Sequence, residues 1–415
     1  MMRLKFAITF SPSTSTKRLA PDTPVTFAPM EAIQDGMGGL DTSRTAPLTD
    51  LKAGSYNVFS DGDVLLAKVT PCFENGKKCL AHDLTGGIGF ATSEVHVMRP
   101  KQEKISPQFL MYLLSSDQFK TEGIISMTGS GGLKRVSAEA VLNHRIVVDD
   151  VSEQSAIADY LDRETGRIDG LIEKKTRFIA LLKEKRAAVI DHAVTKGIDR
   201  NAEMKPSGVE WIGDIPAHWD TPRIATLFRE AFRTPDPDLP VLSVSIHNGV
   251  SDGELSDEER DRKVALSEDR TKYQGVEPGD LVYNMMRAWQ GAFGAVAVSG
   301  LVSPAYVVAR PIAEFRTKYL EHLLHTKSAA EEIRRYSRGI ADFRMRLYWE
   351  YFRDIRVCMP PLPEQDEILS HIDRETARIE GLIEKTERSI ALLKEKRAAL
   401  ITAAVTGKID VRAAA

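Results

Sequence analysis

The sequence has little cysteine, no long apolar run and no strong net charge. Its three cysteines, Cys72, Cys79 and Cys358, are too few and too unevenly spaced for a disulfide framework or a zinc site. No apolar run is long enough to cross a membrane, and the stretch Met1 to Phe10 has no sustained apolar core of the kind found in signal peptides. These absences indicate a protein of the reducing cytoplasm.

The chain of 415 residues is too long for one ordinary hydrophobic core, so we expect two or more domains. Its formal net charge of −3 is not that of a protein whose whole surface binds nucleic acid. Any DNA-binding face must therefore be local.

Motifs of the common catalytic sites are also missing. The sequence contains no Walker A loop, no dinucleotide-binding glycine fingerprint and no nucleophile elbow, and its histidines show no metal-ligand spacing. An adenine-methyltransferase tetrapeptide of the Asn-Pro-Pro-Tyr type is absent, since the stretch Met359 to Leu362 has neither the amide nor the aromatic residue. Asp22 with Asp50 and Lys52 could hold Mg²⁺, but such combinations are frequent by chance. We expect no catalysis and no cofactor in this chain.

One segment of the chain occurs twice. Residues Glu153 to Asp199 match residues Glu364 to Asp410 without a gap, at a shift of 211 positions, and about two thirds of the positions are identical. A period of this length indicates a duplicated module. Two copies within one chain can build a pseudo-twofold axis and can bind related partners twice.

Both copies are predicted to be long helices, because their apolar residues alternate at intervals of four and three. This spacing is that of the a/d positions in a coiled coil. The seam positions are Ile157, Leu161, Ile168, Ile172, Ile179, Leu182 and Val189 in the first copy, and Ile368, Ile372, Ile379, Ile383, Ile390, Leu393 and Leu400 in the second. Further apolar residues widen each stripe, so that it could contact more than one helix; they are Leu171, Phe178, Leu181, Leu382 and Leu392.

The ends of the helices are also marked. Ser152 is the expected N-cap of the first helix, Pro363 suits the first turn of the second, and Gly197 and Gly407 mark the two C-terminal ends. Gly170 and Gly381 either allow a close approach of two backbones or are weak points within the helices.

The segments outside the helices look like two diverged copies of one domain. Val64–Leu66 and Leu281–Tyr283 each follow a Gly-Asp turn and are expected to be strands. The stretch from Val95 to Pro100 resembles the stretch from Tyr306 to Pro311, and each is followed by an amphipathic helix. The order is therefore domain, helix, domain, helix. Because the helices stayed alike while the domains diverged, we expect the helices to meet one kind of partner and the domains two different targets.

With this order, the chain resembles the specificity subunit of type I restriction-modification systems. The motifs are Pro361 to Gln365 at the start of the second helix, the Leu-Leu-Lys-Glu-Lys-Arg run at 181–186 and 392–397, and the stretch from Trp211 to Trp219 that opens the second domain. The match covers essentially the whole chain. It departs in the first domain, which lacks the Ile-Pro-x-x-Trp opening, and at Val151 and Ser152, which replace Leu-Pro.

The resemblance implies an α+β fold with a pseudo-twofold internal repeat, in which two mixed target-recognition domains are joined by two long helices in an antiparallel coiled coil. The implied domains are residues 1–150 and 201–362, and the implied helical regions are residues 151–200 and 363–411.

The resemblance also implies a function. Each domain would read one half of a split site in double-stranded DNA, and the helices would act as a ruler between the domains. Two methyltransferase subunits would dock and methylate adenine, and restriction subunits would translocate and cut. S-adenosylmethionine, ATP and Mg²⁺ would be bound by those partners, so the chain itself would be non-catalytic and free of cofactors.

Two regions of each domain are candidates for DNA contact: the segment that follows the Gly-Asp strand, and a loop farther along the chain. In the first domain a glycine-rich loop precedes a helix, and its backbone amides and cations could bind phosphate. The second domain has an arginine-rich stretch, and arginine can bind guanine through two hydrogen bonds. The candidates are Lys68, Lys77, Lys78, Gly131, Lys134 and Arg135 in the first domain and Arg287, Gln290, Arg338, Arg344 and Arg346 in the second. Each of these could also be a solvated surface residue.

Two other classes of protein stay open on the sequence alone. The chain could be a coiled-coil scaffold whose duplicated domains bind protein and not DNA, or an autonomous enzyme with an unrecognised site. The arginine-rich stretch argues against the first and the missing motifs against the second. The sequence does not give the DNA target.

Overall fold

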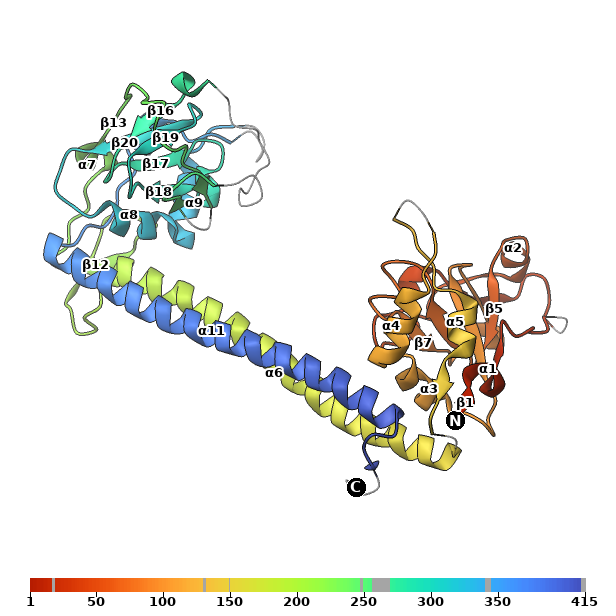
Figure 1. The fold of residues 1–415 in the computed structure, drawn as a ribbon. Helices are drawn as coiled ribbons and strands as arrows, with labels where there is room; N and C mark the ends of the chain where they lie inside the picture. The colour runs from red at the N-terminus through yellow and green to blue at the C-terminus, as the bar shows by residue number, and fades with distance from the viewer. Residues whose placement is uncertain are drawn as a thin grey trace. The chain divides into compact units, whose positions relative to one another are not determined.

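The computed structural model describes residues 1–16, 19–129, 132–148, 150–246, 249–255, 269–339 and 345–411. Contacts between residues divide the chain into two units. Unit 1 comprises Met1–Arg177 with Thr386–Ala415, and unit 2 comprises Phe178–Lys385. Each unit contains one globular domain together with part of each long helix (Figure 1).

The core of the domain in unit 1 is a four-stranded antiparallel sheet in the order β2-β9-β6-β7. A second four-stranded sheet, β4-β3-β8-β5, contains the parallel pair β3 and β8. The strands are β1 (Met2–Arg3), β2 (Ile8–Phe10), β3 (Pro24–Ala28), β4 (Thr45–Pro47), β5 (Asn57–Ser60), β6 (Val64–Ala67), β7 (Lys78–Leu80), β8 (Ile88–Ala91), β9 (Val95–Pro100) and β10 (Arg145–Ile146).

Short helices and 3-10 turns lie between the strands of unit 1. They are α1 (Leu4–Ala7), α2 (Leu48–Lys52), α3 (Pro107–Leu113), α4 (Asp117–Ile125) and α5 (Ala138–Asn143), with 3-10 turns η1 (Met30–Ala32) and η2 (Thr85–Gly87). Ser106, Ser116 and Ser137 each accept a hydrogen bond from a backbone amide in the first turn of α3, α4 and α5, respectively, which explains where these helices begin.

Unit 2 repeats the first of these sheets in the order β13-β20-β17-β18, again antiparallel throughout. Its strands are β11 (Met204–Pro206), β12 (Asp214–Pro216), β13 (Phe228–Glu230), β14 (Val244–Ser245), β15 (Gly249–Val250), β16 (Gln274–Val276), β17 (Leu281–Asn284), β18 (Phe293–Ala295), β19 (Gly300–Val302) and β20 (Tyr306–Pro311). Its short helices are α7 (Ile224–Leu227), α8 (Thr317–Leu324), α9 (Lys327–Tyr336) and α10 (Trp349–Phe352), with 3-10 turns η3 (Arg270–Lys272) and η4 (Ala288–Gln290).

This architecture confirms the strands and helices predicted from the paired motifs. Residues Val64–Leu66 lie in β6 and Leu281–Tyr283 in β17, and the two Arg-Pro motifs end β9 and β20. The central sheet has the same strand order in both units, as expected for diverged copies of one domain.

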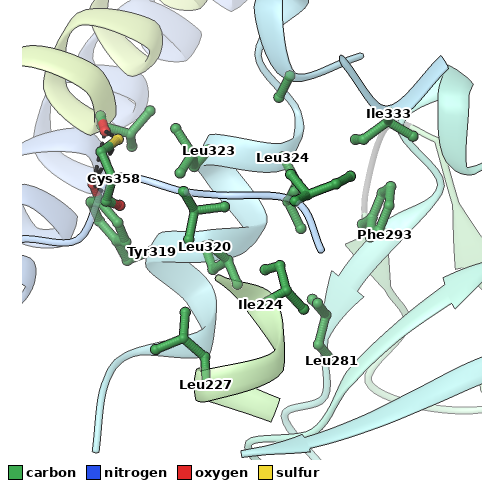
Figure 2. Packing of buried hydrophobic residues seen from close by; sticks show 14 of the residues in the cluster. Ile224, Leu227, Leu281, Phe293, Tyr319, Leu320, Leu323, Leu324, Ile333 and Cys358 are labelled. Atoms are coloured by element: carbon green, nitrogen blue, oxygen red, sulfur yellow. Dashed lines mark hydrogen bonds between the residues drawn. The ribbon is translucent and has the colours of Figure 1, made fainter. Parts of the chain in front are cut away.

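The core of unit 2 joins the domain to the helices. Figure 2 shows Leu320, Leu323 and Leu324 of α8 packed with residues of α7, β17 and β18. The hydroxyl of the fully buried Tyr319 donates a hydrogen bond to the carbonyl oxygen of Val194 in the first long helix, at 2.8 Å. The domain is thus fixed to the helix through a buried bond.

The two repeated segments form the long helices α6 (Val151–Lys196) and α11 (Leu362–Val405). In unit 1 the beginning of α6 packs with the end of α11, and in unit 2 the end of α6 packs with the beginning of α11. The helices are therefore antiparallel, as predicted. Gly197 and Gly407 follow the helices with φ of 78° and 68°, the left-handed conformation expected of C-terminal glycines.

Two expectations about the helices are corrected. The N-cap of α6 is Asp150 and not Ser152, because Oδ1 of Asp150 accepts hydrogen bonds from the amides of Ser152 (2.7 Å) and Glu153 (3.3 Å). Gly170 and Gly381 do not serve a close approach of backbones, because a Cβ added at either would meet no atom within 4 Å.

The predicted seam is confirmed, because none of its residues is exposed. Ile157, Leu161, Ile168, Leu182, Ile368, Ile372 and Ile379 are buried, and Ile172, Ile179, Val189, Ile383, Ile390, Leu393 and Leu400 are half-buried.

An ion pair links the two helices in each unit. Nε of Arg397 lies 2.9 Å from Oδ1 of Asp169 in unit 1, and Nη2 of Arg186 lies 3.3 Å from Oε1 of Glu380 in unit 2. The repeat shift of 211 converts each pair into the other. The helices α6 and α11 therefore pack in a register in which equivalent residues make equivalent ion pairs.

Candidate nucleic-acid interface

In unit 1 the two predicted cationic regions lie side by side. The segment after β6 and the loop between α4 and α5 are joined by hydrogen bonds from the amide of Val136 to the carbonyl of Lys68 (2.8 Å) and from the amide of Thr70 to the carbonyl of Lys134 (3.0 Å). The hydroxyl of Thr70 also accepts a bond from the amide of Lys134, at 3.0 Å. Segments far apart in sequence thus form one surface, which we call the unit 1 loop face.

The cations of the unit 1 loop face differ in their surroundings. Lys134 is exposed, and its ammonium group has no hydrogen-bond or ion-pair partner among the described residues. Lys68 is half-buried. Arg135 is exposed but pairs with Glu94: its Nε and Nη2 donate to the two carboxylate oxygens at 2.9 and 2.8 Å. Gly131 lies outside the described residues.

Lys78 is not a DNA contact, which corrects the expectation. Its side chain is buried, with 1% of the residue exposed, and Nζ donates hydrogen bonds to the carbonyls of Gly36 (3.0 Å) and Gly76 (3.4 Å). The side chain of Lys77 also makes contacts within its own domain, since its Nζ donates to the carbonyl of Ile33 at 2.8 Å and lies 3.9 Å from Oδ1 of Asp35. Adjacent lysines looked like a solvated cluster in the sequence, but the start of β7 directs Lys78 inward.

The burial of Lys78 predicts a pH-dependent stability. Burial, aided by the nearby charges of Lys120 and Arg397, lowers the pKa of Lys78 from 10.5 to about 7. Between these values the unfolded chain binds more protons than the folded one, so unit 1 is expected to lose stability as the pH falls from about 10 to about 7. Lys78→Met should remove this dependence. Chemical denaturation of both proteins across this range checks it, and equal slopes would contradict it.

Unit 2 brings its predicted regions together in the same way. The amide of Leu347 donates to the carbonyl of Met285, the residue after β17, at 2.9 Å. The loop between α9 and α10 is closed by two backbone bonds between Arg338 and Arg346, at 2.8 and 2.9 Å. We call this surface the unit 2 loop face.

The unit 2 loop face carries more arginine and more aromatic contacts than its counterpart. The guanidinium of Arg338 stacks over the ring of Tyr351, 4.6 Å from the ring centre, and that of Arg334 stacks over Trp289 at 5.4 Å. Nε of Arg287 donates to Oε1 of the exposed Gln290, at 3.1 Å. These contacts orient the side chains while leaving donors exposed.

Arg346 differs from these residues. It is exposed, and its guanidinium has no hydrogen-bond or ion-pair partner among the described residues. Arg344, which the sequence also proposed, lies outside the described residues.

The structure shows which residues of the two loop faces are equivalent, and this differs from the match that the sequence suggests. In the sequence, Gly129 lies five residues before Lys134 and Gly339 five residues before Arg344, a spacing that suggests Lys134 and Arg344 are equivalent. The bond from Val136 to Lys68 in unit 1 corresponds to the bond from Leu347 to Met285 in unit 2. Arg135 and Arg346, which precede Val136 and Leu347, are therefore at equivalent positions. Glu94 directly precedes β9, and the residue that directly precedes β20 is Ala305. The arginine at this position therefore pairs with a carboxylate in unit 1, whereas in unit 2 it has no partner among the residues that the structure describes.

Sequence reasoning missed Glu94, Tyr351 and Thr70 as residues of these faces. Glu94 precedes Arg135 by 41 positions, and no sequence signal connects the two. The guanidinium of Arg135 holds the pKa of Glu94 below its usual range, chiefly through the hydrogen bond, and Glu94 in turn raises the pKa of Arg135.

Cations, a glutamine and backbone amides can bind phosphates and base edges, which makes both loop faces suited to nucleic acid. No cluster of three or more metal-ligating side chains occurs in the part of the chain that the structure describes. Among the same residues, no helix has the length and apolar content needed to cross a bilayer.

No protein-family model matches the chain. The chain is 36% identical over 133 residues to the type I restriction enzyme EcoEI specificity subunit of Escherichia coli, and 37% identical over 133 residues to the EcoAI specificity subunit of the same organism. A third of this chain is therefore similar in sequence to type I restriction specificity subunits.

The aligned stretch covers 32% of this chain and 22% of each curated specificity subunit, so the chain matches less than a quarter of their length. The similarity in fold extends over nearly the whole chain. A chain from a structural study of complex assembly and conformational transition in the type I R-M system superposes with a TM-score of 0.71 at 16% identity, covering 98% of this chain and 97% of that one. The HsdS subunit from Thermoanaerobacter tengcongensis superposes with a TM-score of 0.60 at 17% identity, covering 98% and 96%. The expected fold class is confirmed.

Proposed function

We propose that this chain is the DNA sequence-recognition subunit of a type I restriction-modification complex, in which each unit reads one half of a bipartite site. The observation that carries the proposal is the pair of loop faces, built on the same strands of the same sheet but carrying different side chains. Equivalent scaffolds with different contact residues suit two different half-sites. The kinship with specificity subunits supports the same function.

The long helices are the proposed docking surface for methyltransferase subunits. Large apolar side chains outside the seam remain exposed: Leu171 by 40%, Phe178 by 44%, Leu181 by 53%, Leu382 by 39% and Leu392 by 60%. The repeat shift of 211 relates Leu171 to Leu382 and Leu181 to Leu392. Equivalent apolar positions suit two copies of one partner, in which apolar helices would cover them. A restriction subunit would join this assembly.

Catalysis is assigned to those partners. S-adenosylmethionine, ATP and Mg²⁺ would bind to the methyltransferase and restriction subunits, and this chain would contribute recognition alone. Its place of action would be the cytoplasm, where host DNA is found.

The purified chain is expected to neither methylate nor cut DNA, because its sequence carries none of the motifs of those reactions. The measurement is transfer of labelled methyl groups from S-adenosylmethionine to DNA, with this chain alone and with its methyltransferase subunit added. Methylation only in the mixture is the expected result. Methyl transfer by the chain alone would refute the assignment.

A coiled-coil scaffold whose domains bind protein is the alternative. It has less support, because both loop faces carry exposed cations that have no partner among the described residues and that suit the phosphates of DNA. DNA binding by the complex, measured at several salt concentrations, separates the two functions. A DNA reader loses affinity as salt rises, whereas a protein scaffold shows no salt-dependent DNA binding.

A further inference from the structure

We propose that Glu94 is a positioning residue that holds Arg135 ready to read a guanine in the half-site of unit 1. This inference rests on the proposed function and deepens it. It assigns a role in base recognition to an acidic residue, which would otherwise be expected to repel DNA.

The geometry of the pair leaves the reading end of the arginine available. Glu94 accepts from Nε and Nη2 of Arg135, at 2.9 and 2.8 Å, and so occupies one side of the guanidinium. Nη1 has no partner among the described residues, and Nη2 retains a second hydrogen. The Nη1–Nη2 end can donate two parallel hydrogen bonds to O6 and N7 of guanine. A flexible arginine would have to be ordered before it could do so, whereas the carboxylate has already ordered this one.

The backbone around Arg135 is fixed as well. Its amide donates to the carbonyl of Thr128 at 2.9 Å, and its carbonyl accepts from the amide of Thr128 at 3.1 Å. The next residue, Val136, is bonded to Lys68, whose amide donates to the carbonyl of Glu94 at 3.0 Å. Arginine and glutamate are therefore held by one hydrogen-bonded framework, as a site for base reading requires.

The charges around the pair favour DNA despite the carboxylate. Glu94 is compensated by Arg135 and lies near Lys68, whose charge also lowers the pKa of Glu94. Lys134 adds a further exposed cation next to Arg135. An ion pair at the surface adds little to stability, so stability alone gives little reason for this arrangement.

Unit 2 supplies the contrast. Arg346 occupies the equivalent position, but Ala305 stands where Glu94 stands in unit 1. Among the described residues, no carboxylate pairs with Arg346 to orient it. We infer that the two arginines read their half-sites with different stringency, and that the difference lies in residues 94 and 305 and not in the arginines.

The test uses the complex of the full chain with its methyltransferase subunit and a library of DNA duplexes randomised over both half-sites. Arg135→Lys keeps the charge but loses the planar fork, and should lower the preference for guanine at one position by about 5- to 150-fold. Glu94→Gln should lower the preference at the same position by a smaller factor. The double variant should lose no more than Arg135→Lys, because Glu94 acts through the arginine. Glu94→Asp should restore part of the preference.

Ala305→Glu is the matched control, because it places a carboxylate at the position in unit 2 that is equivalent to Glu94 and should leave the base position read by Arg135 unchanged. Melting temperatures close to that of the original chain show that the variants fold.

The inference is overturned if Arg135→Lys or Glu94→Gln leaves every position unchanged. It is also overturned if either variant changes binding to all sequences equally, which would mean a phosphate contact or simple repulsion. A wild-type complex without any sequence preference would instead refute the proposed function itself.

Discussion

Replacement of Arg346 by alanine is expected to relax one base position in one half-site. The side chain is exposed, unpaired among the described residues and carried by a closed loop, so its donors are free for a base edge. Loss of a two-bond contact to guanine would cost about 1–3 kcal/mol at that position. Lys134→Ala should affect only the other half-site, because Lys134 belongs to unit 1. Binding by the complex across the randomised library measures both effects.

Arg229 is a suitable control for Arg346, because it is an exposed arginine of the same unit that lies in β13, outside the segments that form the loop face. Arg229→Ala should leave the base preferences intact. If Arg346 touches only phosphate, its loss should weaken binding on all sequences and reduce the salt slope by about one. An effect on the half-site controlled by Lys134 would show that the reading surfaces are assigned incorrectly.

Lengthening both long helices by four residues is expected to lengthen the spacer between the half-sites. Insertions after Arg177 in α6 and after Arg388 in α11 lie at positions related by the repeat shift of 211. Four residues add about 6 Å of helix. A base pair spans about 3.4 Å, so the spacer should grow by one or two base pairs while the half-sites stay the same.

The matched insertion also tests the register of the helices. Both insertions fall between the ion pairs Asp169–Arg397 and Arg186–Glu380, so both pairs can form when the two helices are lengthened together. An insertion in α6 alone makes the two helices unequal between these pairs, and one pair must then break. We expect that single insertion to lower the melting temperature more than the matched one. An unchanged spacer in the methylation motif would refute the idea of a ruler.

The sequence predicted the parts of this fold that depend on periodicity. The seam residues, the long helices and the paired strands follow from local spacing of apolar residues, because a helix or strand must bury one face. The side chains of the site were harder to predict. Nothing in the sequence distinguishes the side chain of Lys78 from that of Lys77. Only the position of Lys78 at the start of β7 shows that its side chain is buried.

Contacts between distant segments were not predictable at all. Glu94 and Arg135 meet because β9 and the loop after α4 lie beside each other, and no spacing rule connects them. The same applies to Arg338 and Tyr351. The equivalence of Arg135 and Arg346 in the two loops became visible only through the hydrogen bonds of Val136 and Leu347. The regions proposed for DNA contact are those that the structure brings together, whereas the role of each residue depends on its tertiary neighbours.

Recognition of a bipartite site is tested most directly by the set of DNA sequences that the complex of this chain with its methyltransferase subunit selects from a fully randomised duplex library. We expect two short blocks of preferred bases separated by an unread gap of constant length, with Lys134→Ala changing one block and Arg346→Ala the other. Selection of a single continuous block, or of no sequence at all, would contradict it.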